Sequence, residues 1–219
     1  MRREKHVLSL LFVIAAIAAA FLLTSSSQLR ADQAYILTSA TTTARNNSYA
    51  LGQVFTPVQD FTVTALGAFD DQGDGFQTPG GIPVGIFRQS DHALLASTTV
   101  TDSGTLSSDD FRFANISPIA LQAGVQYQVQ AVNESDVYSL AGTFGFGTYD
   151  SSPLFTDQGY QFSADTALDP NNTLVVSSSG HLWMANFLIS VPEPSTVFLA
   201  GLGLVSLGVV ALRKKYRRA

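Results

Sequence analysis

The chain contains no cysteine, and this absence removes several classes of chemistry. Disulfide frameworks, thiolate zinc clusters, iron–sulfur sites and cysteine nucleophiles all need that side chain. A body of roughly 160 residues buries enough apolar surface to fold without disulfides. The missing cysteines are therefore compatible with an exported protein, although they do not demonstrate export.

Basic residues are scarce in the middle of the chain. Between residues 32 and 191, three arginines (Arg45, Arg88 and Arg112) stand against 15 Asp and Glu. Nucleic-acid phosphates require a basic face, so this composition excludes a nucleic-acid partner. An acidic surface favours solubility, cation binding or contact with neutral sugars.

Recognisable catalytic motifs are also missing. Only His92 and His181 follow the N-terminal segment, and the sequence has no Gly-x-Ser-x-Gly, His-Glu-x-x-His or phosphate-binding glycine loop. Glu134 is the only Glu between residues 32 and 191, so no carboxylate pair of the glycosidase kind stands out. We therefore expect a non-enzymatic protein, with a surface hydrolase as the weaker alternative.

Long apolar runs are confined to the two ends. At the N-terminus, Arg2, Arg3 and Lys5 precede an apolar run over residues 7–23, and small polar residues follow. This order is typical of a secretory signal, which we assign to residues 1–31. Ala31 or the serines at 25–27 are alternative cleavage points. An uncleaved N-terminal anchor is the other interpretation, because about 17 apolar residues is the lower limit for crossing a bilayer.

At the C-terminus, a short proline-containing motif precedes a second apolar run. The motif consists of Val191, Pro192, Glu193, Pro194 and Ser195. Residues 196–212 are apolar and glycine-rich, and they predict a short transmembrane helix. The run is followed by a basic tail: Arg213, Lys214, Lys215, Arg217 and Arg218. Positive charge stays on the cytoplasmic side, so we expect residues 32–190 to lie outside the inner membrane.

These three parts, in this order at the end of the chain, resemble the PEP-CTERM sorting signal over about the last 28 residues. The resemblance implies an exosortase as partner, a membrane protease that cuts near Pro-Glu-Pro. It also implies membrane insertion during export, a final location at the cell surface or outside it, and a Gram-negative host that makes exopolysaccharide. The proline residues keep the motif extended, which suits a protease. A plain C-terminal anchor with a proline hinge is the alternative.

Between the two ends, short apolar or alternating runs are separated by turn residues about every ten positions. The runs cover residues 49–55, 61–69, 84–87, 94–100, 111–116, 127–133, 144–149, 174–178 and 181–190. This pattern predicts an all-β fold, an antiparallel two-sheet β-sandwich of jelly-roll or Greek-key-like type over residues 32–190. The run 181–190 is apolar on both faces, which predicts a central strand.

Two local patterns refine this fold. In the run 127–133, we expect Tyr127, Val129 and Ala131 to face the core, and Gln128, Gln130 and Val132 to face outward. Gly124 precedes Tyr127 by three residues, which resembles the tyrosine corner of Greek-key sandwiches. Residues 35–133 also loosely resemble β-sandwich domains found upstream of PEP-CTERM tails.

Two ligand sites are predicted. Asp70, Asp71 and Asp74 lie in a glycine-rich loop and are candidate Ca²⁺ ligands; a solvated turn is the alternative. Phe144, Phe146 and Tyr149 are candidate platforms for sugar stacking, with core packing as the alternative. The leading hypothesis is a structural or adhesive surface protein or exopolysaccharide-matrix component, and the second is a carbohydrate-binding module.

Overall fold

The computed structural model describes residues 32–38, 42–44, 49–142, 148–163, 167–168 and 180–190. All of them belong to one compact unit, Arg30–Val191. Within them the regular structure is β-strand, apart from one 3-10 turn, η1 (Asp71–Gly73), and every strand pair is antiparallel. The predicted all-β antiparallel class is confirmed.

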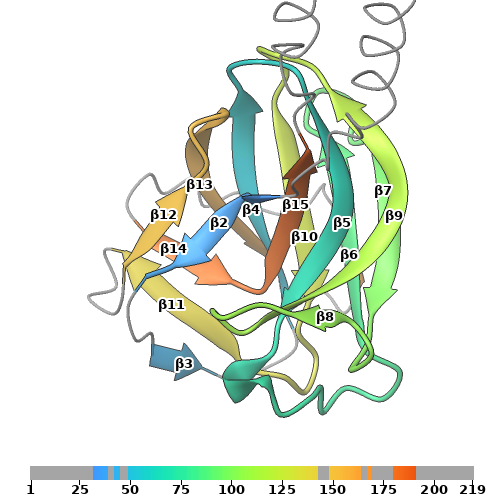
Figure 1. Cartoon of the computed structure of the whole chain (residues 1–219), viewed down its shortest axis with the longest axis vertical. Coiled ribbons are helices and arrows are strands. Elements are labelled where there is room, and N and C mark those ends of the chain that lie inside the picture. The colour runs from blue at the N-terminus through green and yellow to red at the C-terminus, as the bar shows by residue number, and fades with distance from the viewer. Residues whose placement is uncertain are drawn as a thin grey trace, which may run out of the picture. The chain divides into compact units, whose positions relative to one another are not determined.

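Two five-stranded sheets form the body (Figure 1). Sheet I has the order β1 (Asp32–Gln33), β15 (Ala185–Ser190), β5 (Phe61–Phe69), β9 (Phe111–Leu121), β8 (Thr105–Leu106). Sheet II has the order β13 (Phe155–Ser163), β4 (Ala50–Pro57), β10 (Tyr127–Val132), β6 (Ile82–Arg88), β7 (Leu94–Val100). The strands β4 and β5 are consecutive but lie in different sheets, as do β9 and β10. The chain therefore crosses between the layers at these turns.

Two small sheets flank one side of this body (Figure 1). The first has the order β14 (Gly180–Trp183), β11 (Tyr138–Gly142), β3 (Thr42–Ala44). The second is a ribbon of β12 (Tyr149–Ser151) and β2 (Tyr35–Leu37). The buried amide of Asn186 holds β2 against β15, because it accepts from Tyr35 N at 3.3 Å and donates to Tyr35 O at 2.8 Å.

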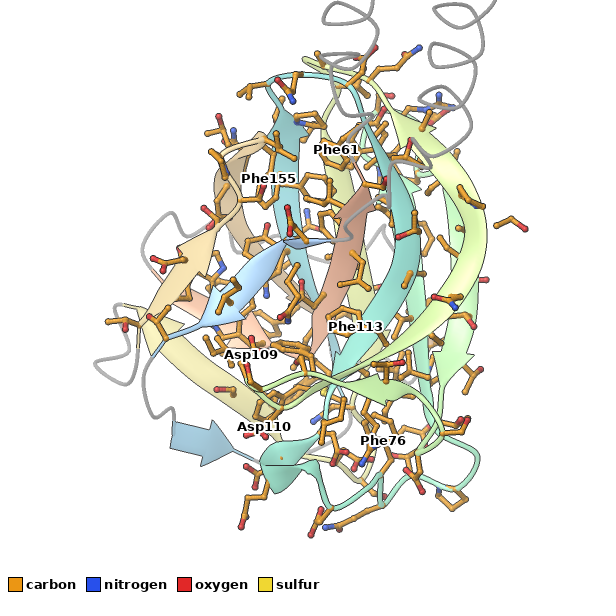
Figure 2. The ribbon with its side chains drawn as sticks, in the orientation of Figure 1. Phe61, Phe76, Asp109, Asp110, Phe113 and Phe155 are labelled. Carbon is orange, nitrogen blue, oxygen red and sulfur yellow. The ribbon has the colours of Figure 1, made fainter. Side chains whose placement is uncertain are left out.

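Aromatic side chains fill the space between sheets I and II. Phe55 of β4 stacks on Phe187 of β15 with ring centroids 4.8 Å apart, and Phe61 lies 6.4 Å from Phe155 (Figure 2). All four rings are at most 5% exposed. Because full burial of such a side chain contributes about 1.5–3 kcal/mol, this aromatic contact is a main source of attraction between the layers.

The sequence pattern predicted the bounds of several strands correctly. The predicted runs 61–69 and 94–100 coincide with β5 and β7. The predicted strand 181–190 is two strands, β14 and β15, because the chain changes partner sheet at Met184. Its second half is central, between β1 and β5, as expected. The predicted run 174–178 lies outside the described residues, as do residues 144–147 of another.

The outward-facing half of β10 lies on the outer face of sheet II, but that face does not meet solvent. Gln128, Gln130 and Val132 are each 1% exposed. The outer face of sheet II is covered. Leu168 packs over Gly85, which is paired with Gln130, and Gln89 Nε2 donates to Gln128 Oε1 at 2.8 Å. Alternation along a strand reports which residues share a face, but not whether that face meets water.

The tyrosine corner is present. The Tyr127 hydroxyl accepts a hydrogen bond from the Gln122 backbone N–H at 3.1 Å, and the Tyr127 side chain is buried. This bond fixes the chain where it passes from β9 in sheet I to β10 in sheet II.

The predicted helices at the two termini lie outside the described residues. Among the described residues, no helix is long and apolar enough to cross a bilayer.

Candidate functional site

A buried polar cluster lies where the β2–β12 ribbon meets the body. It joins four strands: Gln53 comes from β4, Tyr149 from β12, Asp157 from β13 and His181 from β14. The Tyr149 hydroxyl lies 2.9 Å from Asp157 Oδ2 and 2.7 Å from His181 Nε2. His181 Nε2 is also 2.8 Å from Asp157 Oδ2, and Nδ1 is 2.5 Å from Gln53 Oε1. We call Gln53, Tyr149, Asp157 and His181 the polar cluster.

The hydrogen bonds of Gln53 orient the His181 ring in the polar cluster. Gln53 Nε2 donates to the Leu182 carbonyl at 3.0 Å, so Gln53 Oε1 is the acceptor that faces His181. Nδ1 of His181 must then carry a hydrogen. Tyr149 Oη donates to Asp157 Oδ2 and also lies beside His181 Nε2, so the three side chains contact one another at 2.7–2.9 Å.

Aromatic rings enclose the polar cluster. The His181 ring stacks on Trp183 at 4.7 Å between centroids, and Tyr149 and Tyr35 lie 4.9 and 4.8 Å from Trp183. Burial, with the nearby Asp157 charge, raises the pKa of both Tyr149 and Tyr35 well above the ordinary range, because each factor disfavours a phenolate. Tyr35 Oη and Trp183 Nε1 are buried without a hydrogen-bond partner.

The polar cluster holds strands together from a largely buried position. His181 is 1% exposed and Gln53 is fully buried. Each member comes from a different strand. The side-chain hydrogen bonds therefore join these strands in addition to the backbone pairing. His181 and Trp183 are neighbours on β14, and the simplest interpretation of their sequence is strand packing. The stacked rings agree with that interpretation, but the partners Gln53 and Asp157 carry no local signal and were missed.

The structure describes one of the three predicted sugar-stacking residues. Tyr149 is half-buried, its ring lies 4.6 Å from that of His181, and its hydroxyl binds within the polar cluster. Much of its ring surface is thus already occupied by protein. Phe144 and Phe146 lie outside the described residues. Sugar stacking at these three positions stays a prediction.

The predicted calcium loop is organised around an ion pair. The Asp70 carboxylate is 1% exposed, and it binds the Arg112 guanidinium and accepts from Gly75 N at 3.0 Å. Arg112 also donates to Gly73 O at 2.9 Å. Asp71 is partly exposed and Asp74 is exposed. The three predicted ligands are neighbours in sequence, but Asp70 is directed to a cation that the protein supplies itself.

Further carboxylates hold the same loop from a distance. Asp136 accepts from Gln77 N at 2.8 Å, from Thr78 N at 2.9 Å and from the Thr78 hydroxyl at 2.5 Å. Asp102 accepts from Phe76 N at 2.8 Å. Within the part of the chain that the structure describes, no three His, Asp or Glu side chains gather as a metal site would require. The calcium site stays a prediction, while the observed role of these carboxylates is to cap backbone amides.

The sorting segment begins where the sandwich ends. Ser190 is the last residue of β15, is 3% exposed, and pairs with Thr62 of β5. The next residues along the chain are Val191 and Pro192, the start of the predicted processing motif.

Residues 190–218 match the PEP-CTERM protein-sorting motif. The match covers Pro192, Glu193 and Pro194, the apolar run and the basic residues of the tail, and it confirms the predicted sorting signal. A PEP-CTERM segment marks an exosortase substrate, and it directs an exported bacterial protein to the cell surface or beyond. Apart from Ser190, the motif lies outside the described residues. No curated protein matches the chain.

Proposed function

We propose that this chain is a non-enzymatic cell-surface or exopolysaccharide-matrix protein of a Gram-negative bacterium, which an exosortase processes at the PEP-CTERM segment. The observation that carries this proposal is the sorting motif at residues 190–218, directly after the last strand of an antiparallel β body. In this proposal the body is the exported product and the C-terminal segment is a temporary membrane anchor.

The body itself supports a non-enzymatic role. The one described histidine with a carboxylate partner, His181, is 1% exposed and stacks on Trp183. The surface-hydrolase alternative would need an acid or base that touches the substrate. The acidic residues cap backbone amides in loops, and this suits a stable structural module.

The experiment is mass spectrometry of the mature protein from its host, with two variants. Replacing Pro192, Glu193 and Pro194 together by alanine should leave the C-terminal segment attached and the protein in the membrane fraction. Pro79→Ala, in an exposed turn, is the matched control and should be cut like the parent. A parent protein that keeps residues 213–219 after secretion would contradict exosortase processing.

A carbohydrate-binding module, with or without Ca²⁺, is the alternative for the body. It predicts retention of the mature protein on one glycan of an array, with loss on chelation if calcium takes part. Tyr149 already packs within the protein, and this favours the structural role over sugar stacking. Specific glycan retention that Tyr149→Ala abolishes would reverse this preference.

A further inference from the structure

Both ends of the described body emerge at the same end of the sandwich. Asp32 of β1 pairs with Ile189 of β15, so the first and last strands run side by side. The nearby turns belong to the same end: Gly124 N donates to Pro57 O at 2.8 Å, and Gln89 N donates to Gln126 O at 3.0 Å. We call this end, with Asp32, Ser190 and the turns 58–60, 89–93 and 122–126, the chain-end pole.

The opposite end carries most of the negative charge. Its loops, residues 70–78, 101–110 and 133–136, are what we call the acidic pole. Figure 2 shows Asp110 there, far along the sandwich from Phe61. Asp109 lies nearer the middle, where it accepts from Gln33 Nε2 at 3.0 Å. Eight acidic residues lie in these loops: Asp70, Asp71, Asp74, Asp102, Asp109, Asp110, Glu134 and Asp136. Arg112 of β9, which follows the loop 101–110, is bound to Asp70.

The chain-end pole is close to neutral by comparison. Its acidic residues are Asp32, Asp60 and Asp91, and Asp91 is paired with Arg88 at 2.7 Å. Two of the most exposed large apolar side chains also lie here: Val58 is 59% exposed and Leu94 is 52% exposed. This end therefore combines low net charge with exposed apolar side chains.

The length of the connecting chain limits how far this pole can be from a membrane. Five residues, 191–195, separate the end of β15 from the apolar run 196–212. A fully extended chain spans at most about 3.6 Å per residue, so six steps span roughly 20 Å at most. An anionic surface repels the acidic pole, and exposed apolar side chains gain free energy at a bilayer interface.

We propose that the chain-end pole is a lipid-contacting surface in the uncut precursor, with Val58 and Leu94 at the headgroups and the acidic pole facing away. The inference rests on the proposed function, because it needs a membrane-inserted C-terminal segment. It adds an orientation: the body presents its chain-end pole to the membrane, and its acidic pole to the cell exterior or periplasm. Cutting at the motif removes the tether and frees the chain-end pole.

The absence of cysteine allows a direct test on the full chain. Single variants Val58→Cys, Leu94→Cys and Leu106→Cys each carry one environment-sensitive fluorophore. Leu106, 42% exposed in the loops of the acidic pole, is the matched control. The proteins are reconstituted in vesicles of phosphatidylcholine and phosphatidylglycerol, with or without nitroxide-labelled headgroups. Flotation first reports whether the chain is bound to the vesicles.

We expect the nitroxide lipids to quench the labels at positions 58 and 94 at least threefold more than the label at 106. Equal quenching at the three positions in floated protein would overturn the orientation while leaving membrane insertion intact. If the nitroxide lipids do not quench the labels at positions 58 and 94, and their fluorescence depends on the protein-to-lipid ratio, the chain-end pole contacts a second copy of the chain. That result would also overturn the proposed lipid contact. Failure of the chain to float would overturn both the inference and the proposed membrane-anchored precursor.

Discussion

Tyr149 shows how much one hydroxyl contributes when several strands converge on it. Its oxygen contacts Asp157 and His181 in the polar cluster. Tyr149→Phe keeps the ring on Trp183 but leaves the Asp157 carboxylate with one donor fewer. Since a buried hydrogen bond to a charged group contributes about 1.5–3 kcal/mol, we expect the free energy of unfolding to fall by roughly 2 kcal/mol in urea denaturation.

Two comparisons isolate this effect. Tyr49→Phe is the control, since the Tyr49 ring also packs edge-on against aromatic rings, those of Tyr138 and Phe162. Its stability should change less than that of Tyr149→Phe. In a double-mutant cycle of Tyr149→Phe with Asp157→Asn, the two changes should couple by more than about 0.5 kcal/mol. Additive effects would mean that the two side chains do not interact in solution.

Asp110 is a residue whose charge opposes folding. Partial burial, with the charges of Asp71, Asp109 and Asp70, raises the pKa of its carboxyl above the ordinary 3.8. A carboxyl whose pKa is raised by folding stabilises the fold below its unfolded pKa, and this contribution is lost as the pH rises through the folded pKa. Asp110→Asn should therefore stabilise the protein at pH 7, by roughly 0.5 kcal/mol, and the gain should vanish near pH 3.

Asn also suits the backbone at position 110, where φ is 64°. Asp91→Asn provides a contrast of opposite sign. A hydrogen bond from Arg88 lowers the pKa of Asp91, so its substitution removes a favourable interaction at pH 7. The urea unfolding midpoints of the parent and of the two variants, measured at pH 7 and pH 3, test these opposite effects. Destabilisation by Asp110→Asn at pH 7 would show that its contact with the neighbouring loop outweighs the repulsion.

At the scale of elements, the loop after β5 depends on a carboxylate that is distant in sequence. Asp136 is 6% exposed and accepts three hydrogen bonds from Gln77 and Thr78. Asp136→Ala removes the acceptor of the buried Thr78 N–H and hydroxyl donors, which costs about 1–3 kcal/mol. We expect faster amide hydrogen exchange at Gln77 and Thr78 and a lower unfolding midpoint.

Asp74→Asn is the matched control for this loop, because Asp74 is exposed. It should leave exchange at residues 77 and 78 unchanged. Calorimetry with Ca²⁺ on the parent and on an Asp71→Asn, Asp74→Asn variant tests the other role predicted for this loop. Heat from the parent that the double variant abolishes would establish a metal site beside the structural contacts.

The sequence was informative for elements that turn residues bound on both sides. β5 and β7 were located to the residue, because each is a run of apolar and β-branched residues with turn residues on both sides. β13 was missed because a bulge between Asp157 and Gly159 shifts the alternation and separates its two apolar halves. The polar cluster was missed for a related reason. Gln53 and His181 are 128 residues apart, and strand pairing alone brings them together.

At the scale of the whole molecule, the two sheets enclose tyrosines whose ionisation opposes the folded state. Folding raises the pKa values of Tyr35, Tyr149 and Tyr160, chiefly through burial and, for the first two, through the charge of Asp157. A phenol with a raised pKa stabilises the fold below its ordinary value of 10, and that contribution is lost as the pH rises further.

We therefore expect stability to fall by up to about 4 kcal/mol per pH unit above pH 10, since three protons must be released on unfolding. With a total stability of about 5–15 kcal/mol, the body should unfold within a few pH units. Phenolate absorbance should rise gradually for the accessible tyrosines. It should then rise steeply for the enclosed ones, together with loss of the near-ultraviolet circular dichroism of the buried Trp183. The contradicting result is gradual ionisation of all seven tyrosines while the dichroism of Trp183 persists. The enclosed tyrosine rings would then be accessible to solvent in the folded body.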